Sequence, residues 1–191
     1  MMIRAAILLL LSLTCAVPPA QADEAAAWQA LSDGGHVALM RHAAAPGGAG
    51  DPPGFRLEDC ATQRNLSAKG RADAGAIGAR LKAEGIAFET IISSPWCRCM
   101  DTATLLDLGP VVSEPAFSNI VVLSQQRDKI VADGRALIAA WRGAGTLLVV
   151  THGANISALS GISPASGEIV VTRVESDGTI TAVGRIPPPG S

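Results

Sequence analysis

The sequence predicts an α/β protein with three layers, in which helices on both faces cover a mostly parallel central sheet. Short apolar runs of strand length alternate with segments of helical pattern from Gly34 onward, which is typical of this class. The last two apolar runs flank a turn and predict an antiparallel edge. Of the 191 residues, 48% are hydrophobic and only 17% are charged, which excludes a disordered chain and a coiled coil.

The expected strands are short and mostly apolar. They cover residues 36–40, 88–92, 110–112, 146–150, 168–174 and 179–186. The last two lie on either side of Ser176-Asp177-Gly178, a sequence typical of a hairpin turn. The run at 146–150 is continuously apolar, as expected for a strand that is covered on both faces.

Three helices are expected between these strands, over residues 68–84, 98–108 and 125–142. Ser67 and Ser124 are the expected N-caps of the first and third, because a hydroxyl there can accept a backbone N–H. Gly85 and Gly143 follow the ends of the same two helices. Residues 114–123 are expected to form an apolar loop.

The N-terminus has the pattern of a secretory signal peptide. Arg4 supplies a positive charge, residues 5–16 are largely apolar, and Ala20-Gln21-Ala22 is a small-x-small cleavage site. We therefore expect a signal peptide over residues 1–22 and a single mature domain over residues 23–191, in the periplasm or secreted. The alternative is a retained N-terminal anchor helix, against which the short apolar length and Pro18-Pro19 argue, since prolines interrupt a helix.

The charge balance excludes one class of partner. Fifteen Lys and Arg residues stand against 17 Asp and Glu, which gives a formal charge of −2. Nucleic-acid binding depends on a concentrated basic surface, so we expect no nucleic-acid partner. After cleavage of the leader, the sequence contains no candidate membrane span.

Three cysteines remain in the expected mature chain. Cys97 and Cys99 are too close in sequence to pair with each other on a regular helix or strand, so the expected disulfide joins Cys60 to Cys97 or to Cys99. A metal site would need a fourth ligand, and none follows at a recognisable spacing. We expect neither a metal nor a cofactor.

Chemically capable residues follow three of the expected strands. Arg41 and His42 come after the first, Arg98 shortly after the second, and His152 after the run at 146–150. The carboxyl ends of parallel strands form ligand crevices, so these four side chains are expected to meet at one edge of the sheet. Two arginines and two histidines in one cleft would bind an anion such as a phosphate.

The order of these motifs is similar to that of a known family. Leu39-Met40-Arg41-His42, Ser93-Ser94-Pro95-Trp96-Cys97-Arg98 and Val149-Val150-Thr151-His152-Gly153 resemble the motifs of the histidine phosphatase superfamily, which has the phosphoglycerate mutase-like fold. Leu66-Ser67 followed by Gly70-Arg71 resembles the start of that family's first helix. The resemblance extends over about residues 34–186.

The resemblance implies a role for each motif residue. His42 would be the nucleophile that forms a phosphohistidine, and Arg41, Arg98 and His152 would bind the phosphoryl oxygens of a small phosphorylated substrate. Nearby cations disfavour protonation of His42 and lower its pKa from ~6.5, so the imidazole would remain a nucleophile at neutral pH. The same cations would stabilise the charge of phosphoryl transfer.

Two departures from the family pattern concern the same site. Ala43 replaces a glycine that often follows the Arg-His pair, with little expected consequence. Asn119 stands where many relatives have an acid that protonates the leaving oxygen, which an amide cannot do. Glu114 is the candidate proton donor of first choice, and Arg64 and Arg56 are loop cations that either contact substrate or lie in solvent. The other candidate acids are Asp51, Glu58, Asp59 and Asp128.

These expectations point to a periplasmic phosphomonoester hydrolase of the histidine acid phosphatase type, with an envelope phosphosugar as the expected substrate. The first alternative is a phosphohistidine protein phosphatase, which fits a missing acid. The second is a non-catalytic phosphate-binding envelope module that kept the pocket and lost turnover.

Overall fold

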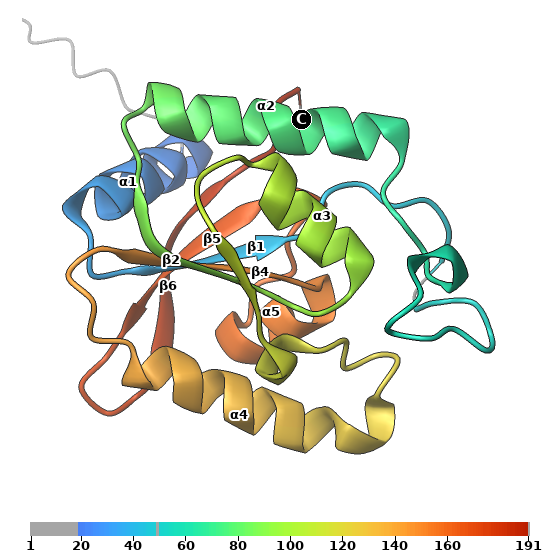
Figure 1. Ribbon diagram of the computed structural model, residues 1–191. Coiled ribbons are helices and arrows are strands. Elements are labelled where there is room, and N and C mark those ends of the chain that lie inside the picture. The colour runs from blue at the N-terminus through green and yellow to red at the C-terminus, as the bar shows by residue number, and fades with distance from the viewer. Residues whose placement is uncertain (1–18, 49, 191) are drawn as a thin grey trace, which may run out of the picture.

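The computed structural model describes residues 19–48 and 50–190, and it contains a six-stranded sheet between two layers of helices (Figure 1). The strand order is β3-β2-β4-β1-β5-β6. The first four of these run parallel, while β5 is antiparallel to β1 and β6 is antiparallel to β5. The predicted fold class and its antiparallel edge are therefore confirmed. The strands are β1 (Val37–Arg41), β2 (Phe88–Ser93), β3 (Val111–Ser113), β4 (Thr146–Thr151), β5 (Ile169–Val174) and β6 (Ile180–Ile186).

Five α-helices within the described residues form the two outer layers. Figure 1 shows α1 and α2 on one side of the sheet and α4 on the other, and the two core clusters place α3 with the first group and α5 with the second. The helices are α1 (Pro19–Asp33), α2 (Ala68–Ala83), α3 (Cys97–Leu105), α4 (Arg127–Ala140) and α5 (Gly153–Ser160), with short 3₁₀ turns η1 (Cys60–Thr62), η2 (Pro115–Phe117) and η3 (Ser124–Gln126).

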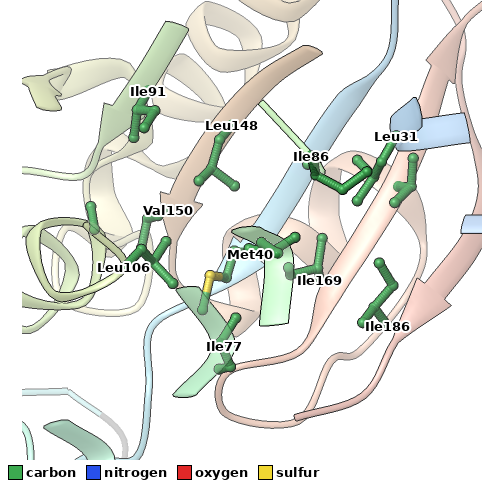
Figure 2. Packing of buried hydrophobic residues seen from close by; sticks show 14 of the residues in the cluster. Leu31, Met40, Ile77, Ile86, Ile91, Leu106, Leu148, Val150, Ile169 and Ile186 are labelled. Atoms are coloured by element: carbon green, nitrogen blue, oxygen red, sulfur yellow. The ribbon is translucent and has the colours of Figure 1, made fainter. Parts of the chain in front are cut away.

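The apolar central strands are buried on both faces. In β1, Ala38 and Met40 pack in the cluster with α1, α2 and α3, whereas Val37 and Leu39 pack in the cluster with α4 and α5. Successive side chains of a strand point to opposite faces, so a continuous apolar run supplies both cores. Figure 2 shows Met40 close to Ile77 of α2 in the first of these clusters.

Three features of the helices differ from expectation. Ser124 lies in η3 and does not cap α4, which begins at Arg127 without a side-chain cap. The helices α1 and α5 were not expected at all, because their small residues give no strong apolar periodicity. Pro19 does not end a helix but opens α1, which proline can do because the first-turn N–H has no helical partner.

The N-terminal helix begins inside the expected leader. The structure describes α1 from Pro19, so it crosses the expected cleavage point before Asp23, while residues 1–18 of the predicted signal peptide lie outside the described residues. Helix α1 packs against β6 at Gly184, where a Cβ would lie 2.1 Å from the Asp23 carbonyl oxygen. Among the described residues, no helix combines the length and apolar character needed to cross a membrane.

Helix α2 begins as predicted. Ser67 Oγ accepts the Gly70 N–H at 2.9 Å and caps the first turn. Farther along, Gly78 lets α2 approach the end of α3, because a Cβ on Gly78 would lie 2.0 Å from the Leu106 carbonyl oxygen. Gly75 lies on the exposed side of the same helix, with no heavy atom within 4 Å of the corresponding position.

Substituting these two glycines by alanine should have opposite effects. Gly78→Ala forces a methyl group into backbone atoms, which costs about 1–3 kcal/mol, so the melting temperature should fall by about 3 °C or more. Gly75→Ala adds helix propensity without a clash and should stabilise the protein by about 0.5–1 kcal/mol. Thermal denaturation followed by circular dichroism measures both. Equal melting temperatures for the two variants would contradict the close α2–α3 contact.

Candidate active site

The two motif histidines lie side by side at the carboxyl edge of the sheet. Parallel pairing of β1 with β4 places Arg41 opposite Thr151, so His42 and His152 leave the sheet at the same level. Their ring centroids lie 5.6 Å apart, with an angle of 71° between the ring planes. Two of the four side chains that the sequence predicts to meet at this edge, His42 and His152, therefore lie next to each other.

Both histidines line a pocket of about 360 Å³. Arg41 and Arg64 supply its positive charge, and neutral polar groups supply most of the remaining polar lining. The other lining residues are Gly50, Asn119, Val121, Gly153, Ala154, Ser157, Ser163 and Pro164.

Local hydrogen bonds define the orientation of His42. Its Nδ1 lies 2.8 Å from the Ala43 carbonyl oxygen, so Nδ1 carries the hydrogen and Nε2 has the free lone pair. The Ala43 N–H in turn donates to Thr102 Oγ1 of α3 at 3.1 Å. Ala43 is fully buried and packs in a small cluster with Leu66, so the fold accommodates a methyl group at this position.

His42 is neutral over a wide pH range. Burial of the ring, which is 3% exposed, is the main cause that lowers its pKa to about 3, and the charges of Arg98, Arg41 and Arg64 lower it further. The hydrogen bond to the Ala43 carbonyl oxygen raises the pKa of His42, but by less than burial and the arginine charges together lower it. Desolvation therefore lowers the pKa of His42 more than the neighbouring cations do, although the sequence pattern indicates the cations alone.

His152 is also buried and neutral. Burial lowers its pKa well below the usual value, and the neighbouring His42 and Arg98 act in the same direction, so a cationic His152 is not supported for the unliganded site. Its Nε2 lies 2.9 Å from Ser94 Oγ at the end of β2, and its Nδ1 lies 3.4 Å from Asn119 Nδ2.

Backbone donors complete the pocket at the start of α5. Gly153 and Ala154 line it, and their N–H groups precede the first helical bond, which Ile156 N donates to the His152 carbonyl. Such unpaired first-turn N–H groups attract an anion. A Cβ on Gly153 would lie 3.3 Å from Arg41 Cδ and Nε, so glycine leaves room for the arginine there.

The Arg41 guanidinium makes one hydrogen bond to the protein and keeps one buried donor without a partner. Its Nη1 donates to the Pro164 carbonyl oxygen at 2.9 Å. Its Nε is buried, and within the described part of the chain it has no hydrogen-bond partner. A buried donor without a partner is costly, and a bound phosphoryl oxygen would satisfy it.

Arg98 lies near enough to both histidines for its charge to lower their pKa values, and its buried Nε has no hydrogen-bond partner among the described residues. Its side chain is fully buried and does not line the pocket. The guanidinium instead forms a bidentate pair with Asp51, with Nη1 2.7 Å from Oδ1 and Nη2 3.2 Å from Oδ2. The cause is a loop between β1 and α2 that brings this carboxylate under α3, which no local pattern around Arg98 indicates.

The candidate proton donors do not reach the pocket. Glu114 Oε1 accepts the Ala116 N–H at 2.9 Å and caps η2, and the residue lines a different hollow beside α4. Asp51 is held by Arg98, while Asp59 pairs with Arg56 and caps η1. Glu58 and Asp128 are exposed. Among the described residues, no carboxylate lines the pocket, and Asn119 lies at the place expected for the acid.

The expected disulfide forms between Cys60 and Cys97, with a Cα–Cα distance of 5.8 Å. It joins η1 to the first residue of α3, next to Arg98. Among the described residues, Cys99 is the cysteine that forms no disulfide. It is buried next to His152, with Cys99 Sγ 3.7 Å from His152 Nε2. Burial raises the pKa of the Cys99 thiol to about 12, so it remains protonated and unreactive.

Several pocket residues had no sequence signal. Ser157 lies on the unexpected helix α5, and Ser163 and Pro164 come from the loop before β5. Arg64 was noted only as a loop cation, although it lies two residues before the Leu66-Ser67 motif. Within residues 19–48 and 50–190, no cluster of three His, Cys, Asp or Glu side chains is arranged to hold a metal ion.

The lining of the pocket suits a small anion, because it combines arginines, backbone N–H groups and neutral imidazoles.

Solved structures share this fold at low sequence identity. A protein histidine phosphatase SixA, complexed with tungstate, has a TM-score of 0.56 and 19% identity, with 80% of this chain and 96% of that chain covered. The alpha-ribazole phosphatase from Shigella flexneri has a TM-score of 0.58 and 15% identity, with 77% and 94% covered. A mycobacterial glucosyl-3-phosphoglycerate phosphatase has a TM-score of 0.53 and 16% identity, with 79% and 95% covered.

Comparison at the level of sequence matches part of the chain to a known family. Curated protein sequences gave no significant match. Residues 37–122, from β1 to the loop before α4, match the family model of the histidine phosphatase superfamily (branch 1). This segment contains the Arg41-His42 motif and α2. Over this segment, which is less than half of its length, the chain is similar to the histidine phosphatase superfamily.

Proposed function

We propose that the protein is a phosphatase that hydrolyses a phosphomonoester through a phosphohistidine on His42. The observation that carries the proposal is the neutral His42, whose Nδ1 is bonded to Ala43 and whose Nε2 is left to attack, in a pocket with two arginines. The superfamily match supports the same chemistry.

Different groups of the pocket have different roles in the proposed reaction. Nε2 of His42 attacks phosphorus, the bond to the leaving oxygen breaks, and water then cleaves the P–N bond and regenerates the imidazole. Arg41 and the N–H groups at the start of α5 bind the phosphoryl oxygens and stabilise the charge that develops on them. A dianion bound beside His152 would favour protonation of that ring, which the empty site disfavours.

The lining of the pocket limits the leaving groups. With Asn119 in place of an acid, no carboxylate among the described residues can protonate the departing oxygen. A leaving group of low pKa, or one joined through a P–N bond, needs the least assistance. This favours a phosphohistidine protein phosphatase as the second candidate function, and the fold similarity to SixA is consistent with it.

An envelope phosphosugar is the substrate that we propose for the first candidate. The hydroxyls of Ser157 and Ser163 lie at the pocket, 3.3 Å apart, and are suited to hydrogen-bond the hydroxyls of a sugar. The leader pattern of residues 1–22 supports a location in the periplasm or outside the cell.

Trapping of the intermediate tests the proposed nucleophile. A brief reaction with a ³²P-labelled aryl phosphate, quenched in alkaline denaturant, should label His42, as peptide mass spectrometry would show. His42→Ala should give no label and should lose at least 1,000-fold in kcat, since covalent catalysis is removed. With a pKa of about 3 the imidazole stays neutral at pH 5, so the labelling rate per reactive substrate ion should change less than twofold from pH 7.

The outcomes of this experiment separate the candidate functions. A histidine with a pKa of 6.5 would lose about 25-fold in its neutral fraction between pH 7 and pH 5. Such a loss would contradict the buried, neutral state of His42. A wild-type protein that binds phosphate without labelling or turnover would instead be the non-catalytic binding module.

A substrate panel tests the missing acid. The value of kcat/KM for p-nitrophenyl phosphate should exceed that for an alkyl phosphate by at least about 100-fold, because general acid catalysis contributes that much where it is present. A phosphohistidine peptide should react faster than the alkyl phosphate for the same reason. Comparable values for an alkyl phosphosugar would show that an acid does act and would favour the first candidate.

The N-terminus of the mature protein tests the proposed export. Protein recovered from the periplasm or medium of a Gram-negative expression host should begin at Asp23, as measured by intact mass and N-terminal sequencing. Ala20→Leu and Ala22→Leu should block processing, because signal cleavage requires small residues there. Protein that stays inside the cell with residues 1–22 attached would contradict the export proposal.

A further inference from the structure

A second hollow lies at the edge of the sheet opposite the catalytic pocket. Gly35 comes just before β1 and Gly143 shortly before β4, so both mark the edge where these parallel strands begin. The turn between β5 and β6 lines the same hollow, because β5 runs antiparallel to β1 and ends at this edge. The hollow has a volume of about 650 Å³. The side chains of this amino-edge pocket include Trp141, Arg142, Val174, Glu175, Ser176 and Asp177.

The amino-edge pocket is separate from the catalytic pocket. Strands of five and six residues, roughly 17–20 Å long, lie between the two. None of the described residues lines both pockets. A ligand in the amino-edge pocket would therefore leave the catalytic pocket open.

One wall of the amino-edge pocket is aromatic. Trp141 follows α4, is half-buried and packs against the core cluster of α4 and α5, as does Val174. The chain passes close to the ring at Gly143, where a Cβ would lie 2.2 Å from Trp141 Cζ2. The indole Nε1 is buried, and among the described residues it has no hydrogen-bond partner. The ring thus gives the pocket a flat apolar surface.

The charges around this pocket balance, in contrast to those of the catalytic pocket. Glu175 pairs with Arg173, with Glu175 Oε1 2.7 Å from Arg173 Nη2. Arg142 supplies a second positive charge, and Asp177 supplies a second negative charge. These four side chains together have no net charge. A phosphate or an ammonium ligand would need an excess of the opposite charge, so the pocket suits a neutral ligand.

Both kinds of charged group keep hydrogen-bonding capacity. Arg142 donates from Nη1 to the carbonyl oxygens of Ala139 and Trp141, which leaves Nε and Nη2 as further donors. A carboxylate accepts about four hydrogen bonds, so Asp177 keeps acceptor sites beside its bond to the Thr179 N–H. Ser176 adds an exposed hydroxyl. The pocket can therefore both donate to a ligand and accept from it.

We propose that the amino-edge pocket is a second, non-catalytic binding site and that its ligand is a neutral saccharide. A sugar ring has hydroxyls that donate and accept hydrogen bonds, and its C–H face is apolar, so it matches an indole ring beside Arg142 and Asp177. A volume of about 650 Å³ is in the range of pockets that hold a small organic ligand. The inference goes beyond the proposed phosphatase activity and does not depend on it.

Titration with neutral oligosaccharides tests the site. The protein should bind at least one of three probes, oligomers of glucose, of galactose or of N-acetylglucosamine, with a Kd of about 0.1–10 mM by isothermal titration calorimetry. Because Trp141 lines the pocket, binding should also change the tryptophan emission. Trp141→Phe should abolish that change, since Trp28 and Trp96 lie outside the pocket.

Substitutions of the polar groups locate the ligand. Arg142→Ala should weaken saccharide binding about 10-fold or more, the loss expected for hydrogen bonds from a charged group. Asp177→Asn should weaken it about fivefold, because a neutral amide is a poorer acceptor. Asparagine keeps an acceptor for the Thr179 N–H and forms an Asn-Gly turn with Gly178, so the hairpin should fold. Circular dichroism identifies the variants that fold.

Arg127→Ala is the matched control for these substitutions. Arg127 is an exposed arginine at the other end of α4 and does not line the pocket, so its replacement should leave the saccharide Kd unchanged. Saturating inorganic phosphate should change that Kd less than about twofold, since independent sites have no coupling free energy.

Two sets of results would overturn the proposal. Displacement of the saccharide by phosphate, or an unchanged Kd in folded Arg142→Ala and Asp177→Asn, overturns the amino-edge pocket as the site. Absence of binding by all three probes at about 20 mM, or tighter binding of an oligoglucuronate or of choline, overturns a neutral saccharide as the ligand. Each of these outcomes leaves the phosphatase proposal intact, because that proposal rests on the other pocket.

Discussion

Parallel pairing of β1 with β4 is the constraint on which the site depends. The register places Arg41 opposite Thr151, so the chain leaves both strands at the same edge and brings His42 and His152 together from positions 110 residues apart. Both strands are buried on both faces, which makes a slip of one residue costly because it would exchange the side chains of the two cores. The core thereby determines the geometry of the pocket.

Burial and positive charge act together on the two histidines. A ring removed from water and placed near arginines loses its proton, so His42 and His152 stay neutral in the empty site. Asp51 pairs with two nitrogens of Arg98, but the Nε atoms of Arg98 and Arg41 are both buried without a partner among the described residues. The empty pocket is therefore a preorganised receptor for an anion, which would satisfy donors that the protein itself leaves unpaired.

The loop between β1 and α2 is held to α3 by covalent and ionic links. The Cys60–Cys97 disulfide closes a loop across 37 residues, and in the chain-entropy account a closure of this length contributes about 4 kcal/mol. The Asp51–Arg98 pair lies beside it, and Gln63 Oε1 accepts the Cys97 N–H at 3.0 Å. A loop of this length would otherwise be mobile, so these links keep Arg64 at the pocket.

The sequence by itself determined the strands, the capped helix after Ser67 and the order of the motifs that contain His42 and His152, because these depend on local patterns of apolarity and on residues at strand ends. It also limited the disulfide to Cys60 with Cys97 or Cys99. Only the tertiary structure decided that Cys97 is the partner, that Arg98 faces Asp51 and that Arg64 faces the pocket. The physical reason is that a charged side chain takes the partner that folding places beside it, and a carboxylate 47 residues away in sequence leaves no local signal.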